Sequence, residues 1–230
     1  MGVQVRQCSG FMNLGAALGR AVVVVCCVLG CRTTVSLAQD TARHEFLEKL
    51  FWERIEEART RYIQADVDFM TGMISHHAQA LVMSALAPTN GANPEIRTLA
   101  ARIINAQKDE IVFMQQWLRD RGETVPEVHI DGTQLMIHGG GHHAMHMPGM
   151  LTDDQIRELE EARGGTFDRL FLRYMIQHHL GAVTMVNDLF DVDGAGQDEA
   201  AFKLASDIHV DQVTEIARME LMLDALNSAE

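Results

Sequence analysis

The feature of this sequence that most constrains its fold is an internal repeat. The 18 residues Asp66–Met83 align with Asp168–Met185, and eight of the 18 positions are identical. A weaker match follows each copy, in which Gln107 corresponds to Gln212. A repeated segment of this kind is one structural unit that buries its apolar face against its neighbour. The chain is therefore expected to fold by packing two similar halves against each other.

Each half has the apolar spacing of two helices joined by a turn. After each copy, apolar residues recur at intervals of three and four and form a single stripe. Pro94 stands where a second helix would begin, a position at which its missing N–H costs little. Glycine-containing turns are expected at residues 88–94 and 193–196. Two helical hairpins predict an all-α fold, a four-helix bundle built from the repeat.

The repeat divides the chain into five expected parts. They are a signal peptide over 1–38, an N-terminal amphipathic helix over 39–65, a first helical hairpin over 66–119, a Gly/His/Met-rich connector with a short helix over 120–165, and a second helical hairpin over 166–230. The short helix is expected to begin at Thr152, which opens a capping box with Gln155. The rest of the connector is long for a compact domain, so we expect a functional or mobile loop.

The first 38 residues have the features of an export signal. The apolar run 21–31 has about half of the roughly 20 residues that a membrane-spanning helix needs, as in a signal-peptide core. Cleavage after Ala38 at a small-residue site is one interpretation, a lipoprotein signal ending before Cys31 is another, and a non-cleaved anchor is the third. All three direct the chain to the periplasm, the extracellular space or the cell envelope. Membrane attachment through lipid is expected only if Cys31 is lipidated.

Charge and cysteine position exclude several classes of protein. The formal net charge is −13, and an acidic chain repels phosphate backbones, so no nucleic-acid partner is expected. All four cysteines lie within the first 31 residues, which excludes disulfide scaffolds and thiolate metal sites from the folded part. The chain instead contains 14 methionines and 11 histidines. These side chains offer thioether and imidazole donors to metal ions.

Eight of these donors recur on one face of the two repeat helices. At about 100° per residue, two methionines and a histidine pair share one sector over three turns of each copy. The predicted helical ligands are Met73, His76, His77 and Met83 in the first copy, and Met175, His178, His179 and Met185 in the second. Thioether sulfur favours Cu(I), whereas imidazole accepts Cu(I), Cu(II) and Zn, so copper is the expected ion and another soft or borderline metal the alternative.

The helical face also has structural interpretations, which stay open. Methionine on a helical stripe is often core filler, and a buried histidine is often simply hydrogen-bonded. Polar residues interrupt the stripe of each following helix and are expected to orient the imidazole rings. These residues are Gln107, Glu110, Gln212 and Glu215.

A second candidate metal site lies in the connector. Its predicted ligands are His138, His142, His143, Met145, His146, Met147 and Met150. Short His-rich tracts bind metals, and glycine gives the backbone freedom to wrap around an ion. Because the tract contains no carboxylates, it suits copper or silver better than calcium or magnesium. The alternative is a flexible linker without a binding role.

The repeated motif resembles that of the family called domain of unknown function 305. The resemblance covers about residues 60–120 and 160–225, and it is based on the Asp, Phe, Met-Ile, His-His, Ala and Met that recur in both copies. It implies a ferritin-like four-helix bundle, usually exported from bacteria, and some relatives resemble periplasmic proteins implicated in copper tolerance. It also implies that the eight helical positions are the ligands. The copies depart from the commoner Gln-Gly-Ala after the His pair: the first reads Ala78-Gln79-Ala80 and the second Leu180-Gly181-Ala182.

Three functions follow as hypotheses. The leading one is a non-enzymatic protein that binds and sequesters copper in the cell envelope. The second is a metal-dependent oxidase, although no histidine has a glutamate three residues before it, as di-metal carboxylate bundles require. The third is a bundle that binds no metal and docks a metal exporter or an identical subunit through the helix over 41–63.

Overall fold

The computed structural model describes residues 39–57, 60–139 and 147–228. The chain divides into two compact units, Met1–Glu57 and Ala58–Glu230. Among the described helices, none has both the length and the apolarity needed to cross a membrane. The segment expected to be a signal peptide lies outside the described residues.

The N-terminal helix of the first unit is shorter than expected. It covers residues 39–57, and large apolar side chains such as Phe46 and Trp52 are exposed on it. A separate helix then begins at Gln64. Its start is fixed by Asp66, whose Oδ2 accepts a hydrogen bond from the backbone N–H of Ile63 at 2.9 Å. An acidic side chain that caps the first turn in this way stabilises a helix start.

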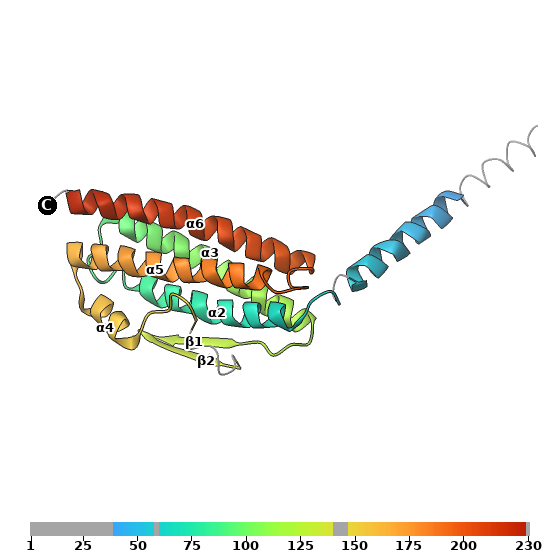
Figure 1. Cartoon of the computed structure of the whole chain (residues 1–230), viewed down its shortest axis with the longest axis horizontal. Coiled ribbons are helices and arrows are strands. Elements are labelled where there is room, and N and C mark those ends of the chain that lie inside the picture. Colours follow the sequence, from blue (N-terminus) through green and yellow to red (C-terminus); the bar gives the residue numbers. More distant parts are fainter. Residues whose placement is uncertain (1–38, 58–59, 140–146, 229–230) are drawn as a thin grey trace, which may run out of the picture. The chain divides into compact units, whose positions relative to one another are not determined.

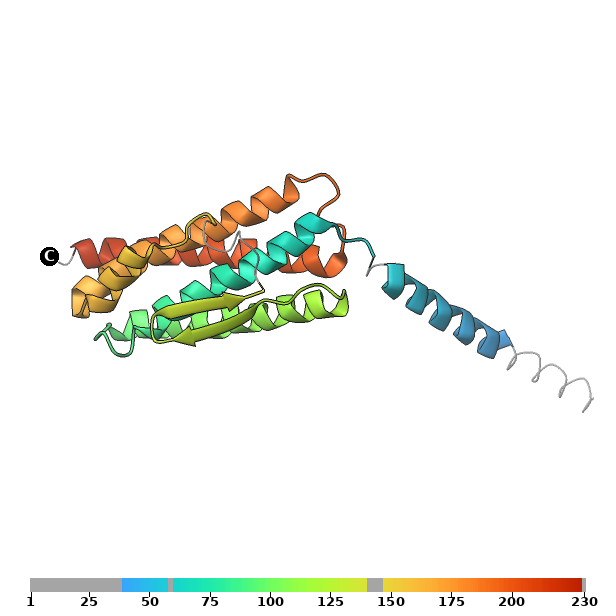
Figure 2. The same cartoon turned by 90° about the horizontal axis from the view of Figure 1, so that it is seen from below.

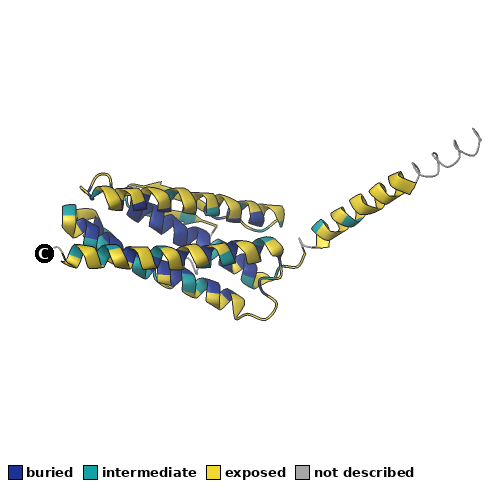
Figure 3. Ribbon diagram, turned by 90° about the horizontal axis from the view of Figure 1, so that it is seen from above, coloured by how far each residue is buried: buried dark blue, intermediate teal, exposed yellow. Residues whose placement is uncertain are grey.

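Four long helices form a bundle in the second unit. They are α2 (Gln64–Ala85), α3 (Pro94–Asp120), α5 (Gly164–Phe190) and α6 (Glu199–Ser228). Helix α2 packs against α3 and α5 against α6, so each repeat is one helical hairpin, and the hairpins meet along α2 and α5 (Figure 1). Buried residues line the sides on which these helices face one another (Figure 3). The all-α fold and its four-helix bundle are confirmed.

Side-chain caps set the starts of two further elements. The Oδ1 atom of Asn93 accepts a hydrogen bond from the backbone N–H of Ile96 at 2.9 Å, and a proline occupies the first turn of α3. In the connector, Thr152 and Gln155 form the expected capping box at the start of α4 (Asp153–Glu161). Both caps satisfy backbone donors that have no partner within a helix. These two predictions from local sequence are confirmed.

The expectation of an irregular loop is wrong for part of the connector. Strands β1 (Glu127–Asp131) and β2 (Gln134–His138) pair antiparallel and lie along α2 (Figure 2). The turn between them contains Gly132 with a φ of +58°, a conformation that favours glycine. Val128 and Ile137 face each other across the pair and are half-buried. The short alternating apolar pattern, obscured by the nearby His-rich tract, explains the hairpin.

The first aspartate of each repeat copy joins the two hairpins. The Oδ1 atom of Asp66 accepts a hydrogen bond from the backbone N–H of Gly196, in the α5–α6 loop, at 2.8 Å. Asp168 accepts bonds from the backbone N–H and the side-chain Nδ2 of Asn93, in the α2–α3 loop, at 3.1 and 3.0 Å. Both aspartates are buried. Each copy therefore ties its first helix to the loop of the other hairpin.

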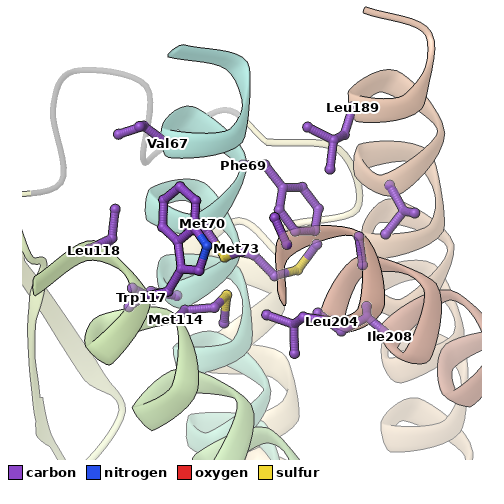
Figure 4. Packing of buried hydrophobic residues seen from close by; sticks show 14 of the residues in the cluster. Val67, Phe69, Met70, Met73, Met114, Trp117, Leu118, Leu189, Leu204 and Ile208 are labelled. Carbon is purple, nitrogen blue, oxygen red and sulfur yellow. The ribbon is translucent and has the colours of Figure 1, made fainter. Parts of the chain in front are cut away.

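The interior of the bundle contains two apolar clusters. The first includes Met73 and Trp117 (Figure 4). Met185 packs against this cluster. The second includes Met83 and Met175. Early α2 thus shares a cluster with late α5, and late α2 with early α5, so the two helices run in opposite directions. The histidine pairs lie midway along both helices, between the two clusters.

Candidate metal centre

Four imidazoles meet where α2 and α5 cross. The side chains of His76, His77, His178 and His179 are all fully buried. The rings of His76 and His178 lie with their centroids 3.8 Å apart and their planes 39° from parallel. Each adjacent pair on one helix is more widely spaced, at 6.5 Å in α2 and 6.3 Å in α5. The two copies of the repeat therefore build one polar layer inside the bundle.

The outer two imidazoles are held by carboxylates on the neighbouring helices. The Nε2 atom of His77 lies 2.6 Å from Oε2 of Glu110, on α3. The equivalent Nε2 of His179 lies 2.8 Å from Oε2 of Glu215, on α6. A second group that fixes the ring in this way orients the other nitrogen for a ligand. The expectation that these glutamates hold the rings is confirmed.

The two glutamines that were also expected to orient the imidazole rings differ from the glutamates in their hydrogen bonding. Gln107 and Gln212 are buried one turn before the glutamates, but neither has a hydrogen bond to an imidazole in the described structure. Both side-chain polar atoms of Gln107 and the Oε1 of Gln212 have no hydrogen-bond partner there. The prediction is therefore wrong for the glutamines, since the glutamates one turn later make the contacts with Nε2 of the outer rings.

The inner two imidazoles donate to backbone carbonyls. The Nε2 of His76 lies 3.0 Å from the oxygen of Pro148, in the connector. The Nε2 of His178 lies 3.0 Å from the backbone oxygen of His76. Because a carbonyl oxygen only accepts, both Nε2 atoms carry the proton. The lone pair of each ring is consequently on Nδ1.

All four Nδ1 atoms lack a hydrogen-bond partner among the described residues. A buried polar atom without a partner costs free energy, so four such atoms in one layer need an explanation. A ring that donates through one nitrogen and has a free lone pair on the other is arranged as a metal ligand. This arrangement fits a cation bound by imidazole.

Burial keeps the inner histidines neutral. Burial and, to a smaller extent, the neighbouring His77 lower the pKa of His76 to about 3. Burial also lowers the pKa of His178 well below its ordinary value, with His76 the next cause. Neutral imidazole is the form that binds metals, so these rings are ready to bind at neutral pH.

The four helical methionines flank the imidazole layer on both sides. Met73, Met83 and Met175 are fully buried, and Met185 is half-buried. Since each apolar cluster contains or contacts one of these four methionines from each copy, a methionine of α2 and one of α5 lie on each side of the layer. In the described part of the chain, no group of three or more His, Cys, Asp or Glu side chains forms a metal cage. A site here would therefore combine imidazole with thioether.

The connector residues are placed only in part. His138 ends β2 and is exposed, while Met147 and Met150 are half-buried. The remaining predicted ligands, His142, His143, Met145 and His146, lie outside the described residues. The structure does not bring His138 into the imidazole layer.

Sequence reasoning missed the residues that fix the connector over this layer. Gln79 makes two hydrogen bonds with the backbone of Leu151, at 3.0 and 2.8 Å. A Cβ atom on Gly181 would lie 2.0 Å from the oxygen of Pro148, so only glycine permits the backbones to approach. Positions 79 and 181 are equivalent in the two copies. The difference between these two positions can be read from the sequence, but the reason for it is the path of the connector, which only the structure shows.

The fold and this layer define a class of protein: a bundle of two repeated helical hairpins that places a histidine pair and two methionines of each copy in its interior. A family profile matches this pattern over residues 66–223. The chain belongs to the family described as Domain of unknown function (DUF305).

Solved structures of similar proteins cover most of this chain. A DUF305 fragment from Deinococcus radiodurans is 30% identical, with a TM-score of 0.58 over 71% of this chain and 98% of its own. A DUF305 protein from Streptomyces coelicolor, described as a candidate secreted protein, is 28% identical, with a TM-score of 0.57 over 71% and 94%. CopM in its Ag-bound form is 28% identical, with a TM-score of 0.52 over 70% and 96%. CopM is also known in Cu(I)-bound and Cu(II)-bound forms.

One curated relative matches a shorter stretch. It is an uncharacterized protein of Acanthamoeba polyphaga mimivirus, 36% identical over 63 residues, which are 27% of this chain. The match spans 41% of the length of that relative.

Proposed function

We propose that this chain is an exported protein that binds copper or silver ions through methionine and histidine and sequesters them in the cell envelope. The observation that supports this most directly is the set of four buried Nδ1 atoms without partners. Glu110, Glu215 and two backbone carbonyls engage Nε2 of the four rings, so the lone pair on each Nδ1 is left to bind a metal ion.

The donor set favours a soft or borderline ion. Neutral imidazole accepts both oxidation states of copper, and thioether sulfur stabilises Cu(I) and the chemically similar Ag(I). A fully buried layer between apolar clusters also excludes water, which favours a weakly hydrated monovalent ion over Ca²⁺ or Mg²⁺. The similar CopM structures with Cu(I), Cu(II) and Ag support the same ions.

Binding rather than catalysis is the proposed role. The carboxylates that hold the outer imidazoles are single glutamates on separate helices, and no Glu-x-x-His pair occurs in the sequence. Sequestration needs only donors and burial. The similar protein described as a candidate secreted protein supports export. Docking to a metal exporter, self-association and lipidation at Cys31 stay predictions.

The test is a competition titration of the purified chain with Cu(I) and Ag(I) against a chelator of known affinity. We expect more than one ion per chain, and a loss of at least one ion in the double variant His76→Gln/His178→Gln. His129→Gln is the matched control, because His129 is exposed on β1 and should leave the stoichiometry unchanged. Failure of the unaltered chain to retain either ion against the chelator would contradict the proposal.

A further inference from the structure

Two thioethers from distant segments converge on one glycine of α2. A Cβ atom on Gly72 would lie 3.2 Å from Sδ of Met147, in the connector, and 3.3 Å from Cε of Met185, on α5. Both side chains thus end at the one point of this helix surface that has no side chain of its own. In the second copy the equivalent position is Tyr174, whose hydroxyl instead donates to Glu158 of α4.

This convergence lies beside the imidazole layer. Gly72 precedes His76 by one helical turn, so the two residues share a face of α2. Met147 directly precedes Pro148, whose carbonyl accepts the hydrogen bond of His76 at 3.0 Å. The methionine pair is therefore adjacent to a ring whose Nδ1 has no partner in the described structure.

One of the two methionines is reached from outside the bundle. Met147 lines a groove of about 800 Å³ bordered by α2, β2 and α4. Met147 and Met185 are both half-buried, whereas the other three helical methionines are fully buried. Met147 therefore offers a thioether to an ion in the groove, whereas none of the four buried histidines lines it.

The presence of glycine at position 72, in the middle of α2, needs an explanation. Glycine in the middle of a helix is less favourable than alanine, because it loses more backbone entropy on folding. A Cβ atom at Gly72 would press on both methionine ends, so the absence of a side chain makes room for the sulfurs. Met is flexible and polarisable, and two thioethers suit a d¹⁰ ion of low coordination number.

We propose that Met147 and Met185 form a separate soft-ion site over Gly72, the first site that an incoming Cu(I) or Ag(I) ion occupies. The site joins a connector methionine to a helical methionine, which the sequence placed in two unrelated groups. The inference rests on the proposed function, since it assigns a route to the same metal-binding layer.

The test uses the full chain with ¹³C-methyl methionine, titrated with Ag(I) and followed by NMR. We expect the methyl resonances of Met147 and Met185 to shift together, at the same equivalent of Ag(I). Gly72→Val removes no donor but fills the space, so we expect it to abolish the shared shift and weaken that step at least tenfold. Gly72→Ala adds one methyl group and should weaken it less.

Gly165→Ala is the matched control, since a Cβ atom there would approach only Arg169 Nη2, at 3.9 Å. It should leave the Ag(I) titration unchanged. The inference is overturned if the two resonances shift at different equivalents, or if both Gly72 variants bind Ag(I) as the unaltered chain does. In those cases Ag(I) still binds and only this inference fails, whereas an unaltered chain that binds no Ag(I) contradicts the proposed function as well.

Discussion

The two copies of the repeat are alike inside the bundle and different outside it. Inside, His77 with Glu110 and His179 with Glu215 make the same contact, and the glutamate side chains have similar exposure, 15% and 18%. Outside, the connector covers the two copies unequally. It hydrogen-bonds to Gln79 of the first copy and presses its backbone on Gly181 of the second.

This difference shows how a duplicated unit acquires two unequal halves. The duplicated sequence places the same histidine pair at equivalent positions of α2 and α5, and so the imidazoles are arranged symmetrically. The single connector can follow only one path, and so its Pro148 carbonyl binds His76 and not His178. The binding layer is thus nearly symmetric, while access to it is not.

The largest expected effect is that of acid on the apo protein. Below pH 6.5 the unfolded chain binds a proton at position 76, which the folded chain does not take up until about pH 3. Stability is therefore highest above pH 6.5 and falls as the pH falls. Between pH 7 and 4.5 we expect a loss of about 3 kcal/mol from His76, and His178 adds to it in the same direction. Urea unfolding across this range measures the loss, and a flat profile would contradict it.

The symmetry of the outer contacts is tested by removing each glutamate in turn. Glu110→Ala and Glu215→Ala each leave a buried imidazole without its partner, which costs about 2–3 kcal/mol. Because the contacts are equivalent, we expect the two free energies of unfolding to agree within about 0.5 kcal/mol. Asp109→Ala and Glu220→Ala are controls, since both residues are exposed on the same helices. Unequal losses of unfolding free energy in the two glutamate variants would contradict the equivalence of the two contacts.

The asymmetry is tested first at the close approach. Gly181→Ala places a Cβ atom against the oxygen of Pro148, so the connector must move. We expect a loss of about 2 kcal/mol in the free energy of unfolding, as for overpacked interiors. The displaced carbonyl should also alter the NMR resonances of His76 more than those of His179. Gly165→Ala again serves as the control, and equal changes at both histidines would argue against a one-sided connector.

The smallest effect is expected at the equivalent position of the first copy. Gln79→Ala removes two hydrogen bonds to the Leu151 backbone without any clash, which costs about 1–2 kcal/mol. Chemical denaturation measures the cost, and hydrogen exchange at the Leu151 amide should accelerate. If this amide exchanged at an unchanged rate, the connector would be held by something other than Gln79.

Local sequence was a good guide where a pattern repeats or a cap is close by. The periods of α2 and α5 and the caps at Asn93 and Thr152 depend on residues within three or four positions. The β1–β2 hairpin was missed because its alternating pattern is only five residues long in each strand. Such short patterns are decided by pairing and by contact with α2, and neither contact is local.

The sequence alone determined the four-helix architecture and which eight donors share a face, because helical periodicity and duplication fix both. Only the tertiary structure decided which nitrogen of each ring is free and which methionines meet. Those outcomes depend on partners far apart in the chain, such as Glu110 for His77 and Pro148 for His76. In an interior without water, each buried polar atom forms a hydrogen bond with the partner that the packing brings within reach, and this determines which ring nitrogen stays free.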